Sequence, residues 1–267
     1  MLEEIVIRPV GVVKSDLLDH KKAPDSEPKA VVEVFPEYAG ALKQLEKNSH
    51  LWILTWFHLA RRNVLAATPY RINPNSPSYG VFALRTPVRP NPVGLNLVQL
   101  DRVAGLELYV TGLDAVNETP VIDIKPYYEN DIVFSPRTPH IYSLKRKMQR
   151  SLLLKQALTH HQEECAGLLL AVRMALIAEE RLGQLNSPDL YVMVEGSPCL
   201  ADTIQGLSRA RLANPPRFEY RPADWPGRTI WRLGSKVLSI TARRQIDKGA
   251  FSETDDNEIL DISMQTP

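Results

Sequence analysis

The sequence has only two cysteines, no long apolar run and almost no net charge. Two cysteines are too few for a disulfide framework, and reduced thiols are typical of the cytosol. The longest apolar runs, such as residues 51–54 and 168–172, are far shorter than the roughly 20 residues that a membrane-spanning helix needs. A net charge of +1 gives no overall basic excess for nucleic acid. We therefore expect no membrane partner, and any nucleic-acid binding would need a local basic patch.

The first residues also lack the features of a secretory signal. Glu3 and Glu4 stand where a signal peptide carries Lys or Arg, and no long apolar segment follows them. Together with the reduced thiols, this predicts a cytoplasmic location.

Proline is concentrated in the first half of the chain, with 14 of the 21 prolines in residues 1–140. There, short β-branched or alternating runs are separated by Pro, Gly and Asn, which is typical of an all-β barrel or sandwich. The clearest hairpin turn is at residues 102–105, between two alternating runs. We expect strands at residues 4–13, 30–35, 51–58, 79–84, 95–103, 106–113 and 121–124, and one helix at 36–47.

From Ser143 onward the apolar residues follow helical spacing. Residues 163–182 are apolar through their middle and are followed by Gly183, which predicts a buried core helix. A short buried strand at 190–194 and a helix at 198–209 complete an α+β pattern. We therefore expect a multidomain chain with an all-β small barrel at residues 1–140, an α+β domain at 141–250 and a loosely held acidic tail at 251–267.

Three stretches of the first domain contain candidate functional residues. The prolines around Asn91 stiffen a loop that would display Arg85, Arg89 and Asn91, although a rigid connector with surface ion pairs explains the same pattern. Residues 114–128 include Asp123 and Lys125, and the alternative there is an Asx-turn followed by a strand. His58 ends an aromatic run, where a lone histidine is more often structural than a ligand.

The same stretches resemble a known family. Residues 34–42, 49–52, 56–58, 85–95 and 119–127 are similar, in this order, to motifs of the TrmO (TsaA-like, YaeB) family, over about residues 5–135. The resemblance implies an S-adenosylmethionine-dependent methyltransferase on a small β-barrel, often dimeric, whose known members methylate N6 of threonylcarbamoyladenosine beside the tRNA anticodon. The sequence has no Gly-x-Gly-x-x-Gly turn of a Rossmann-type methyltransferase, which agrees with this fold.

The resemblance also implies a set of site residues. The methyl donor would lie against His58, Leu59, Arg85, Leu95, Asp114, Ala115, Val116 and Asn117. Arg89, Lys125 and Tyr127 would bind the acceptor, and Asn91 and Asp123 are the candidate catalytic residues. Asp123 is the candidate base, with a purely structural role as its alternative. Because methyl transfer from a sulfonium depends chiefly on in-line placement, positioning is the expected contribution of the protein.

This chain departs from the family at several places. A Pro-Arg-Gln segment that contacts the donor in bacterial members corresponds here to residues 21–28, and the usual Asp-Gly-Thr-Pro is Asn117-Glu-Thr-Pro120. The C-terminal extension of bacterial members is replaced by an unrelated sequence. These departures favour donor binding over a tRNA acceptor.

In the second half, both cysteines lie where helices are expected to begin. A thiol at a helix N-terminus is biased toward the thiolate, the form that binds metals. With His161 nearby, Cys165 and Cys199 would suit zinc or another soft divalent ion, and two small buried apolar residues are the alternative.

The surrounding motifs resemble the FmdE family over about residues 150–245. The matching stretches are 161–168, 172–175 and 194–205. In that family the corresponding His and Cys residues are associated with a metal site, which implies the ligands His161, Glu163, Cys165 and Cys199 here. Glu163 replaces a family histidine, and Arg211 stands at about the position of a third family cysteine. A scaffold that has lost its metal is the alternative.

Local charge gives one further indication. Residues 203–248 contain ten Lys or Arg against three Asp or Glu, and residues 137–155 contain six bases and no acid. These stretches could form a basic surface for RNA phosphates, or simply a solvated face.

We therefore expect a homodimeric S-adenosylmethionine-dependent methyltransferase that acts on modified adenosine in tRNA. The first alternative is methylation of a small molecule or metal-bound ligand that the second domain presents. The second is a sensor that binds the donor or a metal without turnover.

Overall fold

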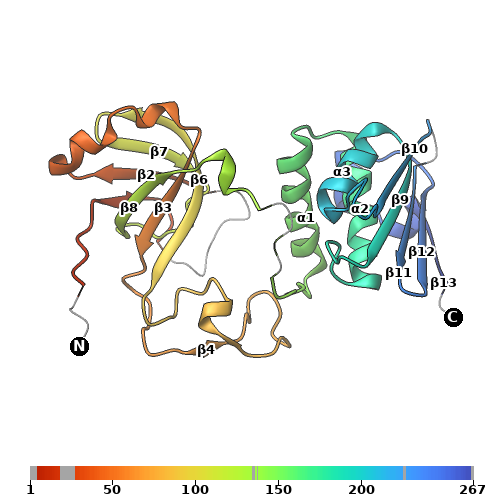
Figure 1. Ribbon diagram of the computed structural model, residues 1–267, viewed down its shortest axis with the longest axis horizontal. Helices are drawn as coiled ribbons and strands as arrows, with labels where there is room; N and C mark the ends of the chain where they lie inside the picture. Colours follow the sequence, from red (N-terminus) through yellow and green to blue (C-terminus); the bar gives the residue numbers. More distant parts are fainter. Residues whose placement is uncertain (1–4, 19–27, 134–135, 137, 225–226, 266–267) are drawn as a thin grey trace. The chain divides into compact units, whose positions relative to one another are not determined.

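The computed structural model describes residues 5–18, 28–133, 136, 138–224 and 227–265. Contacts divide the chain into two compact units, one of Met1–Tyr70 and Pro74–Val133 and the other of Arg71–Asn73 and Phe134–Pro267 (Figure 1). The division lies close to the predicted domain boundary, and each unit has its own apolar core. Within the described residues, no helix combines the length and apolarity needed to cross a membrane.

The first unit is a closed barrel in which neighbouring strands are antiparallel and follow the order β1-β2-β7-β6-β3-β8 (Figure 1). Its strands are β1 (Gly11–Lys14), β2 (Lys29–Val34), β3 (His50–Trp56), β6 (Val93–Ala104), β7 (Glu107–Thr111) and β8 (Pro120–Pro126). Alternate residues of each strand point inward, so that Leu51, Ile53 and Thr55 of β3 are fully buried. This confirms the all-β barrel that the sequence predicts.

Several predicted elements of the barrel differ in detail. The strand predicted at residues 4–13 is limited to β1, in keeping with Pro9, which has no N–H for a ladder. The predicted helix at 36–47 is two short 3₁₀-helices, Pro36–Leu42 and Leu45–Lys47, because Gln44 between them has a left-handed backbone with φ of +66°. The predicted hairpin is present, and Gly105 turns it with φ of +63°.

The prediction of a strand at residues 79–84 is correct only for its first two residues. Only β5 (Tyr79–Gly80) pairs, with β4 (Ala66–Ala67), and Val81–Ala83 forms a 3₁₀-helix. The Arg89 guanidinium donates to the carbonyl oxygens of Val81 and Leu84, at 2.6 Å from the first, and so holds this turn.

The second unit is an α+β fold with a five-stranded sheet in the order β10-β9-β11-β12-β13. Helices α1, α2 and α3 lie on one face of this sheet (Figure 1). The helices are α1 (Arg146–His161), α2 (Ala166–Leu182), α3 (Pro198–Ser208), α4 (Lys248–Glu253) and α5 (Asp256–Ile259). The strands are β9 (Leu190–Gly196), β10 (Phe218–Pro222), β11 (Arg228–Leu233), β12 (Lys236–Ala242) and β13 (Leu260–Gln265).

The predicted core helix is α2, whose side chains are almost all buried from Leu168 to Ala178. Gly183 ends it with φ of +86°, as predicted. In contrast, the described part of the predicted acidic tail is not loosely held, because Ile259 and Leu260 are buried and β13 pairs with β12. The acids in this segment do not prevent pairing, since Asp261 on the strand forms an ion pair with Arg243.

Candidate functional site

Several of the predicted donor contacts lie in segments that adjoin the end of β3. In the barrel register, Thr55 of β3 lies opposite Gly94 of β6 and Val121 of β8. Beyond this point the Phe57 N–H donates to the Pro92 carbonyl oxygen at 2.8 Å. The turn after β3, the segment entering β6 and the loop entering β8 therefore meet at one end of three adjacent strands. We call His58, Leu59, Asn91 and the loop 114–117 the barrel-end cluster.

Other predicted residues lie on the outer face of the same three strands. Leu54 of β3 lies opposite Leu95 on one side and Asp123 on the other. Lys125 is opposite Trp52, and the ring of Tyr127 lies 5.8 Å from that of Trp52. Leu95 is 49% exposed, so this face presents apolar side chains outside the barrel core.

Some predicted residues have structural partners instead. Arg89 uses its guanidinium to hold the turn at Val81–Ala83, which supports the rigid-connector alternative. The Asn117 side-chain oxygen accepts a hydrogen bond from the Ser15 N–H at 3.1 Å, which joins distant parts of the chain and is not the Asx-turn of the alternative. Ala115 is buried in the barrel core. Asp123 forms a 2.7 Å ion pair with Lys125 on the outer face. Asp114 is exposed and Val116 is half-buried.

Two polar side chains near this end are available for a ligand. His58 and Arg85 are exposed and form no hydrogen bond or ion pair with the described residues. In addition, the hydroxyls of Thr55 and Thr119 are buried without a hydrogen-bond partner at the same end of the barrel. A free guanidinium suits the carboxylate of an amino-acid group, and unpaired donors suit a nucleoside. The residues present therefore fit S-adenosylmethionine. Residues 21–27, where the family contact differs, lie outside the described residues.

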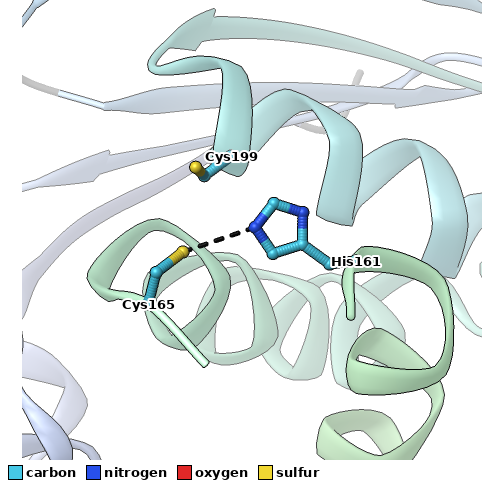
Figure 2. Close-up of side chains that lie close together, drawn as sticks. All are labelled: His161, Cys165 and Cys199. Carbon is cyan, nitrogen blue, oxygen red and sulfur yellow. Dashed lines mark hydrogen bonds between the residues drawn. The ribbon is translucent and has the colours of Figure 1, made fainter. Parts of the chain in front are cut away.

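In the second unit, three predicted metal ligands converge. Figure 2 shows the His161 ring and the sulfur atoms of Cys165 and Cys199 facing a common space. Their ligand atoms all lie within 4.8 Å of one another. Ligand atoms around a tetrahedral zinc are roughly 3.5–4 Å apart, so small side-chain rotations would bring these three to bonding distance. We call these residues the His–Cys–Cys cluster.

The cluster is built from three helix ends. His161 is the last residue of α1, Cys165 caps α2, and Cys199 is in the first turn of α3. Gly167 allows α2 to approach α3, because an added Cβ would lie 2.7 Å from the Cβ of Cys199. A larger residue at position 167 would therefore separate the two sulfurs.

Hydrogen bonds hold the side chains of the cluster and shift the pKa values of its members. Asp202 accepts a bond from His161 Nδ1 at 2.6 Å, and His161 Nε2 lies 3.4 Å from Cys165 Sγ. The bond to Asp202 raises the pKa of His161. Burial raises the pKa of Cys165, but the Leu168 N–H and His161 outweigh it and hold that pKa below its ordinary value. Burial and the neighbouring Cys165 raise the pKa of Cys199. The cluster thus favours one thiolate, on Cys165.

The fourth predicted ligand, Glu163, is exposed and is not part of this group of ligand atoms. Cys165 of the cluster also lines a cavity of about 480 Å³. Its other lining residues are Glu164, Ala166, Leu169, Gln245, Ile246, Asp247 and Lys248.

Comparison with known proteins agrees with both units. Residues 14–131 match the family model described as tRNA-methyltransferase O N-terminal domain, and residues 160–252 match that described as FmdE, molybdenum formylmethanofuran dehydrogenase operon. A probable S-adenosyl-L-methionine-binding protein of Methanothermobacter thermautotrophicus is 49% identical over 131 residues, which cover 48% of this chain and 93% of that protein. The chain belongs to the TrmO family.

Other TrmO-related proteins match over different lengths. A protein of the same name from Archaeoglobus fulgidus is 35% identical over 221 residues, covering 79% of this chain but only 60% of that relative. The tRNA (adenine(37)-N6)-methyltransferase of Rattus norvegicus is 40% identical over 111 residues, covering 39% of this chain and 25% of that protein. A crystal structure of TrmO from Pseudomonas aeruginosa aligns with a TM-score of 0.43 at 20% identity, over 91% of this chain and 95% of that one.

Sequence reasoning missed the role of Asp202. It lies one helical turn after Cys199, in the motif that resembles FmdE, and that spacing was the available signal. Its partner His161 comes from a different helix, and a one-dimensional pattern does not show such a contact.

The basic stretch in residues 203–248 is largely paired. Arg221 and Arg243 form ion pairs with Glu219 and Asp261, and Arg217 donates to carbonyl oxygens of Ser187 and Leu190. These contacts support the solvated-face alternative for this stretch.

Proposed function

We propose that this TrmO-family chain methylates N6 of threonylcarbamoyladenosine in tRNA, with S-adenosylmethionine as methyl donor and the barrel-end cluster as its binding site. The observation that supports the proposal is that the turn after β3, the segment from Arg85 into β6 and the loop entering β8 lie at one end of three adjacent strands. The name of the rat relative, which specifies N6 of adenine 37, supports this acceptor.

Each residue has a definite task in this proposal. Arg85, exposed and unpaired among the described residues, would bind the donor carboxylate. Leu59 and Leu95 would provide the apolar wall, and Asp114 would accept from ribose hydroxyls. The bound donor supplies a methyl group on a sulfonium sulfur. Asn91 and Tyr127 would orient the acceptor, which is the main requirement for this transfer.

Asp123 is the candidate base in this proposal, and its carboxylate is paired with Lys125 at 2.7 Å on the outer face. A homodimer is also part of the proposal, because Leu97 is 42% exposed on the outer face of β6, and a second copy would cover it.

The test measures transfer of labelled methyl from S-adenosylmethionine into total tRNA. We expect incorporation by the wild-type chain and a roughly 10- to 100-fold loss with Arg85→Ala, since a hydrogen-bonded charge contributes about 1.5–3 kcal/mol. Arg102→Ala is the matched control, because Arg102 stacks on Tyr109 at the far end of β6. Binding of the donor without any label in tRNA would rule out the tRNA acceptor.

A second candidate function has its own supporting observation. The His–Cys–Cys cluster beside a cavity supports a zinc ion held by His161, Cys165 and Cys199, and an acceptor molecule bound in that unit. In this case a small-metabolite extract, rather than tRNA, would take up the label.

A further inference from the structure

The inference concerns the zinc site proposed above and rests on it. We propose that this site is open, with three protein ligands, and that its fourth position binds a small thiol lying in the cavity beside Cys165.

The first step is the number of ligands that the chain supplies. Structural zinc sites have four protein ligands, whereas sites that bind a substrate keep one position for it. Among the described residues, only three His, Cys, Asp or Glu side chains group closely enough here. Glu164 pairs with Lys248 at 3.0 Å, and Asp202 contacts His161 and His160, while Glu163, which lies near Cys199, is outside the group of ligand atoms.

The second step is the role of Asp202, which does not bind the ion but positions His161. Its 2.6 Å contact with Nδ1 keeps the proton on that nitrogen and directs the Nε2 lone pair toward the two sulfurs. The side chain of His161 is only 11% exposed, so its ring is held on the inside of the site. Both oxygens of Asp202 therefore stabilise the arrangement of ligands, and neither is left for the ion.

The third step is the space next to the ligands. The cavity of about 480 Å³ is within the usual range for small-molecule sites, and Cys165 forms part of its wall. Leu169 and Ile246 provide an apolar lining, while Gln245 and Lys248 offer hydrogen-bond donors at the side. Because Cys165 belongs both to this wall and to the cluster, a molecule in the cavity would lie next to a ligand of the proposed ion.

The class of ligand follows from the donor set. Zinc with two thiolates and a neutral imidazole carries no net charge, and zinc forms strong bonds to sulfur. A thiol that binds in the fourth position loses its proton to solvent and becomes a thiolate. In the cavity wall, Leu169 and Ile246 lie among the polar residues Glu164, Gln245, Asp247 and Lys248, so the wall offers contacts to both the carbon chain and the polar groups of a small thiol.

The experiment uses the full chain loaded with Co²⁺, which reports on ligands through its visible absorption. We expect one cobalt per chain, with sulfur-to-cobalt bands. Addition of 2-mercaptoethanol should shift these bands in a saturable way while the cobalt stays with the protein in gel filtration. Gln245→Trp, an exposed change that narrows the cavity, should weaken the thiol effect at least about tenfold and leave cobalt binding unchanged.

Two further measurements distinguish the alternatives. Glu163→Gln should leave the cobalt spectrum unchanged, and a weaker or altered spectrum would make Glu163 the fourth ligand and overturn the inference. A spectrum that responds to acetate but not to the thiol would overturn the proposed ligand class. Failure of cobalt to bind at all would instead refute the zinc site itself.

Discussion

At the residue scale, the buried Arg173 side chain holds the segment around α4 and α5 against helix α2. Arg173 lies in the apolar helix α2 and is 1% exposed. Its guanidinium donates to the Asp256 carboxylate at 2.7 Å and to the carbonyl oxygens of Phe251 and Thr254 at 2.8 Å each. Asp256 is also paired with Arg146. These bonds tie the segment that follows α4 to the core helix.

The first stability prediction concerns this pair. Asp256→Ala would leave a buried guanidinium without its counter-ion, and loss of one partner of a buried pair costs about 3–5 kcal/mol. We expect the free energy of unfolding of this unit, measured with urea, to fall by that amount. Glu258→Ala, an exposed acid two residues away, should change it by less than about 0.5 kcal/mol. Equal unfolding midpoints for the two variants would contradict the role of Asp256.

The sequence predicted the grouping of the candidate metal ligands better than their supporting residues. His161, Cys165 and Cys199 were identified from motifs and helix starts, and they do converge. Glu163 was predicted by analogy with a family histidine, but it lies on the exposed turn between α1 and α2. Asp202 was missed because its partner comes from another helix. Periodicity predicts which residues share a helix face, but it does not predict which side chains from different helices will touch.

At the scale of elements, the His–Cys–Cys cluster depends on the close approach of α2 and α3. Cys165 and Cys199 both lie at helix N-termini, where Ser197 caps α3 and the Cys165 sulfur caps α2. Gly167 is the position at which the two helices nearly touch.

We therefore predict that Gly167→Ala weakens metal binding without unfolding the chain. The added methyl group would contact the Cβ of Cys199 at 2.7 Å, so the helices must separate by a few tenths of an ångström or more. Competition with a chelating dye should show a loss of zinc affinity of about tenfold or more. Gly40→Ala, where an added Cβ meets nothing within 4 Å, is the control and should bind zinc normally. Wild-type affinity in Gly167→Ala would mean that the helix spacing does not set the site.

Elements with strong periodicity were predicted well, and those shaped by tertiary contacts were not. The helices α2 and α3 and the strands β2, β3 and β7 match their predictions closely. The β11–β12 hairpin was missed although both strands alternate around Gly234, which turns the chain with φ of +57°. The 3₁₀-helix Val81–Ala83 was predicted as a strand because it begins with a β-branched residue. The hydrogen bond from Arg89 that holds this turn is a tertiary contact, which the local sequence does not indicate.

At the scale of the whole molecule, the chain joins two units with separate cores. The barrel core contains residues of β1, β2, β3, β6, β7 and β8, and the second core gathers around α2. The barrel carries the TrmO match and the second unit carries the FmdE match. The proposed binding of the methyl donor therefore belongs to the barrel and the proposed binding of zinc to the second unit, so each can be measured while the other is impaired.

The most direct measurement of the central claim is calorimetric titration of the full chain with S-adenosylmethionine. We predict one donor bound per chain, with affinity roughly 10- to 100-fold weaker in Arg85→Ala and unchanged in Arg102→Ala. The absence of heat with the donor and with its demethylated product, or an affinity that Arg85→Ala leaves intact, would contradict the proposed binding site at the end of β3.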